Sequence, residues 1–193
     1  DVCSSDLQDE MIELLHGLGS TSEKIRVEQS ADRTDAPRVD VVHEGRTTGV
    51  SFRGVPGGHE FSSLVLAILN ADGKGRLPDE GILARIRALK GPVRLKTYVS
   101  LSCENCPEVV QALNLMAIVH SDFEHETIDG AVAQQEVDQL GIQGVPSVIA
   151  DGKLVHSGKI SLVDLLGKLE ETFGKSVEGV VKKDLGLFDV VVV

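Results

Sequence analysis

The chain is poor in several features, and each shortage excludes a class of protein. Three cysteines in 193 residues are too few for a disulfide-built scaffold. No stretch approaches the roughly 18 consecutive apolar residues that a membrane-spanning helix requires. Basic residues form no cluster of five or more, and 30 acidic against 19 basic residues give a net charge of -11. Nucleic acid and anionic membranes are therefore poor partners for this surface.

The two ends of the chain look unlike the rest. The amino terminus lacks the basic-then-apolar pattern of a secretory signal, so we expect a cytoplasmic protein. Residues 1–7, DVCSSDL, resemble a translated sequencing adapter, and we exclude Cys3 from functional interpretation on that basis. Residues 188–193 are typical of a buried parallel strand, which we expect to continue into further sequence. Between these ends, a hydrophobic content of 41 % suffices for one or two globular domains.

Two cysteines, Cys103 and Cys106, form a C-x-x-C pair between a strand-like run and a helix-like run. In a reducing compartment such a pair is more often redox-active or metal-binding than structural. A cysteine at the start of a helix has its thiolate stabilised by unpaired backbone N–H groups and the helix dipole. We therefore predict that Cys103 is the nucleophile and that Cys106 resolves the mixed disulfide.

A zinc site is the alternative for the same cysteines. Together with His120 and His125 they give C-x2-C-x13-H-x4-H, one residue from the spacing of a DNA-binding zinc finger. The segment between the two pairs is one long apolar helix, however, rather than the hairpin and helix of a finger. We therefore favour a dithiol and predict no metal site.

The second half of the chain alternates strands and helices. The pattern predicts a β-α-β-α-β-β-α order, with strands at 93–99, 123–128, 146–150 and 153–156 and helices at 108–118, 131–140 and 161–173. This order, with C-x-x-C at the first helix and Val145-Pro146 before the third strand, is the thioredoxin and glutaredoxin arrangement. A cis bond before Pro146 would place Val145 against the cysteines and leave backbone groups for an incoming peptide.

The first half shows a related pattern without the cysteines. It predicts helices at 9–18 and 59–70 and strands at 24–29, 39–43 and 49–53, with Glu44-Gly45 as the hairpin turn. We therefore predict an α/β fold of two fused thioredoxin-like units. Residues 8–90 form the first, truncated at its start and ending in a helix at 77–90, and residues 91–173 form the second. Residues 174–187 are predicted to be a linker.

Four ordered segments of the chain are distinctive: GHEFSSLVLAIL (58–69), TYVSLSCENCPEVVQALNLM (97–116), TIDG (127–130) and GVPSV (144–148). Together they resemble one family, the N-terminal domain of the flavoprotein component of alkyl hydroperoxide reductase, which reduces a peroxiredoxin. The resemblance covers residues 57–173 and weakens before Gly57, where the first strand of the family is missing. It implies two thioredoxin-like units, the first of them without cysteines.

The resemblance also implies a route for electrons. In that family they pass from NADH or NADPH to FAD, to a dithiol in the flavin domain, to the N-terminal dithiol and then to the peroxiredoxin disulfide. Matched by position, the N-terminal dithiol is Cys103 and Cys106, supported by Val145 and Pro146, and Glu60 lies near it to assist proton transfer. Residues 188–193 would begin the FAD/NAD(P)-binding Rossmann domain. The resemblance implies a homodimer for the complete protein. We expect this chain itself to be a monomer that binds no cofactor.

Two other functions remain open on the sequence. One is a stand-alone protein disulfide oxidoreductase with two thioredoxin-like units that acts on many proteins. The other is a non-enzymatic binding module, either metal-loaded or scaffold-like. Continuation of the chain into a glycine-rich phosphate loop would favour the reductase.

Overall fold

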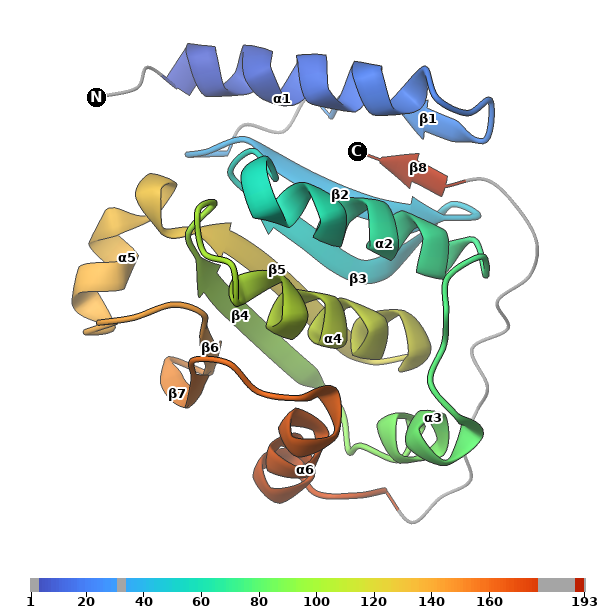
Figure 1. The fold of residues 1–193 in the computed structure, drawn as a ribbon, viewed down its shortest axis with the longest axis vertical. Coiled ribbons are helices and arrows are strands. Elements are labelled where there is room, and N and C mark those ends of the chain that lie inside the picture. The colour runs from blue at the N-terminus through green and yellow to red at the C-terminus, as the bar shows by residue number, and fades with distance from the viewer. Residues whose placement is uncertain (1–3, 31–33, 177–189, 193) are drawn as a thin grey trace.

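A single mixed sheet organises the protein. The computed structural model describes residues 4–30, 34–176 and 190–192, and its strands follow the order β1-β8-β2-β3-β5-β4-β6-β7. Helices α2 and α4 pack side by side against one face of this sheet (Figure 1). The elements in chain order are α1 (Ser4–Gly19), β1 (Ile25–Val27), β2 (Arg38–His43), β3 (Arg46–Arg53), η1 (Gly58–Glu60), α2 (Phe61–Ala71), α3 (Glu80–Arg87), β4 (Val93–Val99), α4 (Cys106–Val119), β5 (Phe123–Asp129), η2 (Gly130–Val132), α5 (Gln134–Gln139), β6 (Ser147–Ala150), β7 (Lys153–Ser157), α6 (Leu162–Phe173) and β8 (Val190–Val192).

The second thioredoxin-like unit has the predicted β-α-β-α-β-β-α order. Its central strand β4 pairs in parallel with β5 and antiparallel with β6, and β7 closes the hairpin. Alternate residues of β4 are buried toward α4, because successive side chains of a strand point to opposite faces. Ser161 caps α6 by accepting the N–H of Asp164, as the sequence pattern predicts.

The first unit repeats the second without its cysteines. Both hairpins turn on an acid-glycine pair with positive φ, Glu44-Gly45 and Asp151-Gly152. Pro37 O accepts a 2.8 Å hydrogen bond from Gly54 N, and Pro146 O accepts one of the same length from Gly158 N. Each hairpin also has a single register shift, and in both the extra residues lie in the second strand. The prediction of two thioredoxin-like units is therefore confirmed.

Strand β8 takes a particular place in the first unit. It is parallel to β1 and antiparallel to β2. In the second unit β4 stands in the same relation to β5 and β6. Residues 190–192 thus occupy the sheet position that corresponds to the first strand of a thioredoxin-like unit. Their assignment to a Rossmann domain stays a prediction.

The two units share one sheet and one core. Strand β3 of the first unit pairs in parallel with β5 of the second. One continuous apolar cluster runs from Met11 of α1 through Leu64 of α2 to Leu166 of α6. Eleven of the fourteen residues of α4 are buried, ten of them within this cluster. Burial on this scale fixes the dithiol-bearing helix against both units.

Some element boundaries differ from those predicted. The helix expected at 131–140 is divided into η2 and α5, because Ala133 has φ -128 and ψ 32, outside the helical region. The helix expected at 77–90 is only α3, which begins after its N-cap Asp79. Helix α1 already begins at Ser4, inside the stretch interpreted as an adapter, whereas Cys3 and most of the predicted linker lie outside the described residues.

Candidate redox site

The site centres on a disulfide between Cys103 and Cys106. Their Cα atoms are 5.5 Å apart, the spacing that a disulfide requires. Helix α4 begins at Cys106, with Pro107 in its first turn, where a missing N–H costs nothing. Cys103 lies three residues earlier, in a turn closed by its own N–H and Ser100 O at 2.9 Å. The sequence pattern predicts Cys103 at the helix start, whereas the structure places Cys106 there.

The two cysteines differ in exposure. Cys103 is partly buried, whereas Cys106 is 0 % exposed and packs in the apolar core. A protein disulfide that approaches from solvent meets Cys103 first. Glu104 and Asn105 between them are exposed and form the outer surface of the loop. This geometry fits the predicted order of attack and resolution.

The loop with Val145 and Pro146 approaches the disulfide through the carbonyl group of Val145. The Val145-Pro146 peptide bond is cis. The Sγ of Cys103 is 3.9 Å from the carbonyl oxygen of Val145. Strand β6 begins immediately afterwards at Ser147, so this loop forms one wall of the site.

Turn η1 of the first unit forms a further contact with the cysteine loop. The N–H of His59 donates a 3.1 Å hydrogen bond to the carbonyl oxygen of Leu101, two residues before Cys103. The same turn packs against α4. The structure thus places the segment that contains Glu60 against the loop that carries the dithiol, across the boundary between the units.

Glu60 is an unusual carboxyl. It is 1 % exposed, and neither side-chain oxygen has a hydrogen-bond partner of ordinary geometry. Burial raises its pKa to about 7, although the nearby Ser63 hydroxyl acts in the opposite direction. A carboxyl with such a pKa exchanges a proton near neutral pH, which a general acid or base requires.

The two histidines of the zinc alternative make hydrogen bonds to groups other than the cysteines. The ring of His125 contacts Thr97 Oγ1 and Asn114 Oδ1, both at 2.7 Å. The ring of His120 contacts Leu89 O and accepts the N–H of Asp122. Within residues 4–30, 34–176 and 190–192, no group of three or more His, Cys, Asp or Glu side chains is arranged to hold a metal. The zinc-finger spacing therefore does not correspond to a cluster in space.

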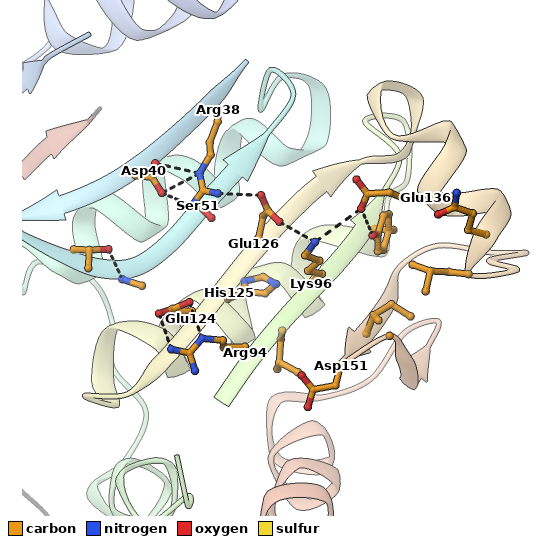
Figure 2. Close-up of a pocket in the computed structure, with 18 residues that line it drawn as sticks. Arg38, Asp40, Ser51, Arg94, Lys96, Glu124, His125, Glu126, Glu136 and Asp151 are labelled. Carbon is orange, nitrogen blue, oxygen red and sulfur yellow. Dashed lines mark hydrogen bonds and ion pairs between the residues drawn. The ribbon is translucent and has the colours of Figure 1, made fainter. Parts of the chain in front are cut away.

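A groove of about 740 Å³ lies on the opposite face of the sheet, away from the cysteines. Glu126 of β5 and Glu136 of α5 join its two sides through ion pairs to cations of both units, and Tyr98 donates to Glu136 at 2.7 Å (Figure 2). Helix α4 covers the other face, where His125 meets Asn114. Of the candidate site residues only His125 of the zinc alternative lines the groove, and none of the predicted redox residues does.

Sequence reasoning missed the contact between Gly58 and Leu101. A Cβ on Gly58 would lie 2.5 Å from Leu101 O, and Gly58 has φ +53, so glycine is required on both counts. The Gly57-Gly58 pair before a helix was the available signal, because glycine permits close approach of two backbones. Nothing in the sequence indicated which backbone it approaches.

Comparison with known proteins agrees with this geometry. A family model described as a thioredoxin domain matches residues 93–171. The F component of alkyl hydroperoxide reductase from Staphylococcus epidermidis is 42 % identical over 170 residues, 88 % of this chain and 33 % of that protein. A protein of Bacillus subtilis named NADH dehydrogenase is 38 % identical over 188 residues, 97 % of this chain and 36 % of that protein. The chain therefore spans about a third of the length of these relatives.

A solved structure is also similar to this chain, and it comes from a protein of the same name as the first relative. The NTD_N/C domain of alkylhydroperoxide reductase AhpF from Enterococcus faecalis has a TM-score of 0.78 and 28 % identity, with 83 % of each chain covered. No helix in the described part of the chain is long and apolar enough to cross a membrane. The C-x-x-C disulfide within a thioredoxin-like unit identifies the chain as an oxidoreductase that acts on disulfides. The chain belongs to the AhpF family of alkyl hydroperoxide reductase components, and its two thioredoxin-like units correspond to the N-terminal domain of that family.

Proposed function

We propose that this protein is the electron-transfer module of an NAD(P)H-dependent peroxiredoxin reductase. The observation that carries the proposal is a C-x-x-C pair with Cys103 partly buried and Cys106 fully buried in the core, beside a cis-proline loop. The chemistry is a dithiol–disulfide exchange. It moves two electrons from the cysteines to the partner and leaves Cys103 and Cys106 joined, as the structure has them.

Two displacements make up the exchange. The thiolate of Cys103 attacks one sulfur of the partner disulfide, which forms a mixed disulfide and releases the other partner sulfur as a thiolate that takes up a proton. Cys106 then loses its proton and attacks Cys103 Sγ. The bond between Cys103 and the partner breaks, and the second partner sulfur leaves as a thiolate and is protonated in turn.

Glu60 serves as the proton acceptor for Cys106 in the second displacement. Cys106 is buried, so water reaches its thiol poorly, and a nearby base is needed. Turn η1, which carries Glu60, packs on the helix that Cys106 begins. A pKa of about 7 lets the carboxylate accept this proton and release it again near neutral pH.

The partners and cofactors of the proposed pathway lie outside this chain. The peroxiredoxin disulfide is the acceptor, and a flavin domain of the same protein, which holds FAD and receives hydride from NAD(P)H, is the donor. The name of the Bacillus subtilis relative supports a nicotinamide donor. We propose that the complete protein is a cytoplasmic homodimer.

Trapping the mixed disulfide tests this function. The chain is reduced, freed of reductant and mixed with an oxidised peroxiredoxin. Wild type is expected to lose two thiols while the peroxiredoxin gains two, measured by alkylation and mass spectrometry. Cys106→Ser is expected to accumulate a mixed disulfide through Cys103, and Cys103→Ser to transfer nothing. A mixed disulfide through Cys106 in the Cys103→Ser variant would overturn the assignment.

The stand-alone disulfide oxidoreductase is the second candidate, because two fused thioredoxin-like units suit it equally well. The same reduced chain, offered disulfide-bonded insulin in place of the peroxiredoxin, separates the two functions. A peroxiredoxin reductase module is expected to reduce the peroxiredoxin at least about a hundredfold faster, since docking adds to the intrinsic reactivity of the thiolate. Equal rates would favour the general oxidoreductase.

A further inference from the structure

Gly58 is where the cysteine-less unit touches the loop that carries the dithiol. It is in the left-handed region, with φ +53. A Cβ at this position would lie 2.5 Å from Leu101 O and 3.3 Å from Leu101 C. The next residue, His59, binds the same carbonyl oxygen through its N–H. No side chain at position 58 is compatible with this backbone contact.

The place of Glu60 depends on that contact. Gly58, His59 and Glu60 form a single 3-10 turn, in which Glu60 N donates to Gly57 O at 3.0 Å. The turn therefore moves as a unit. The carboxyl of Glu60 has no hydrogen bond of ordinary geometry to anchor it. Its position therefore follows the backbone of the turn, which is held by the contact with Leu101, by the bond from the Ser62 hydroxyl to His59 O at 3.0 Å and by its continuation into α2.

We propose that Gly58 is a positioning residue of the redox site: by letting η1 rest on the carbonyl of Leu101, it holds Glu60 where it takes the proton from Cys106. The cysteine-less unit is thereby a working part of the site rather than only a scaffold. This inference rests on the proposed role of Glu60. It requires that changes at Gly58 slow the second displacement and spare the first, since Cys103 attacks without help from Glu60.

A chromogenic aromatic disulfide, 5,5′-dithiobis(2-nitrobenzoate), separates the two steps. Attack by the thiolate of Cys103 releases one coloured thiolate, and resolution by Cys106 releases a second. Stopped-flow absorbance of the reduced chain thus gives two phases, each measured from pH 5 to 9. In wild type the second phase is expected to rise with an inflection near 7, where Glu60 ionises.

Gly58→Ala is expected to slow the second phase by at least about tenfold and to remove its inflection near 7, with the first phase within about twofold. Glu60→Gln should give the same result. Gly57→Ala controls for adding a methyl group beside position 58, because Gly57 has φ -92 and open space around a Cβ. Gly73→Ala is the control for backbone strain, because it has φ +66 and nothing within 4 Å. Both controls are expected to behave as wild type.

A second variant covers the case in which Gly58→Ala does not fold. His59→Pro removes the N–H that binds Leu101 O without adding a Cβ at position 58, in a first turn that tolerates proline. It is expected to lose the second phase in the same way. The control for its fold is the thermal melting of the oxidised form.

Three results would overturn the inference, and they are distinguishable. If Glu60→Gln slows the second phase and Gly58→Ala and His59→Pro do not, Gly58 has no positioning role while the proposed function of Glu60 stands. If Gly73→Ala slows it as much as Gly58→Ala, the effect is backbone strain. If Glu60→Gln changes nothing, the proton step fails and the role of Gly58 fails with it.

Discussion

Glu60 shows how strongly the surroundings change a single residue. The same side chain on the surface, as in Glu104, is solvated by water. At 1 % exposure, and with neither oxygen hydrogen-bonded in ordinary geometry, the charged form of Glu60 has no such solvation. Its pKa rises to about 7 for this reason. A carboxyl that is costly to keep buried is retained where its proton is useful.

The raised pKa of Glu60 predicts how stability depends on pH. Between pH 4.5 and about 7 the folded protein holds a proton that the unfolded chain has released, so the free energy of unfolding falls as pH rises. Above pH 7 the loss reaches at most about 3 kcal/mol. Glu60→Gln is expected to be more stable than wild type at pH 8 and similar to it at pH 4.5, measured by urea unfolding. Glu104→Gln, an exposed control, should show no such difference. A wild type more stable than Glu60→Gln at pH 8 would contradict this.

His125 is another buried titratable residue. It is 0 % exposed, and burial lowers its pKa to about 3, so it stays neutral with its ring held between Thr97 and Asn114. His125→Leu is expected to cost about 2–4 kcal/mol, because Thr97 and Asn114 lose their partner inside the core. Chemical unfolding at pH 7 measures this, with His16→Leu on the exposed side of α1 as the control. A cost below about 0.5 kcal/mol would show that the network does not stabilise the fold.

Helix α6 begins at a serine whose side chain caps its first turn. The capping serine of α6 accepts the N–H of Asp164 at 3.2 Å and donates to its carboxylate at 2.7 Å. Ser161→Ala is expected to cost about 1 kcal/mol. Thr172→Ala is the control, since that exposed hydroxyl only bonds back to Lys168 O within the helix. The melting temperatures of both variants are compared with that of wild type. An unchanged melting temperature for Ser161→Ala would refute the capping role.

At the scale of elements, helix α4 was predictable and helix α5 was not. Residues 106–119 combine a proline in the first turn with a nearly continuous apolar surface, so propensity and burial favour the same helix. The segment from Gly130 to Gln139 has weaker apolar spacing, and Asp129 caps a separate 3-10 turn by accepting the N–H of Ala131. A local cap divided what periodicity alone predicts as one helix.

Across the whole molecule, ion pairs on the groove face tie the two units together. Arg53 of β3 binds Glu136 of α5 through two hydrogen bonds and also approaches Glu126 of β5 at 3.6 Å. Arg53→Gln is expected to cost about 1–3 kcal/mol, because Glu136 then loses its closest cation in a partly buried place. Arg94→Gln breaks an exposed pair with Glu124 and should cost less than about 1 kcal/mol. Urea unfolding at pH 7 compares them, and equal costs would show that the pairing between units adds nothing.

Oligomeric state is a further property of the whole molecule. We expect the chain by itself to be a monomer, because we propose that the contacts of the complete homodimer lie in the flavin domain. Light scattering coupled to size exclusion at several concentrations measures this. A stable dimer at the lowest concentration would contradict the prediction.

The sequence by itself determined the dithiol, the alternation of strands and helices and the duplication of the unit. These depend on interactions between near neighbours, such as two cysteines three positions apart or an acid-glycine pair between two apolar runs. Such interactions can be read along the chain.

Only the tertiary structure decided that Gly58 contacts Leu101, that Glu60 is buried without a partner, that His125 joins Thr97 and Asn114, and that β8 lies between β1 and β2. Each of these joins residues far apart in sequence. Their meeting depends on how strands order within the sheet and how helices pack on it, and that is set by burial of the whole core rather than by any local pattern.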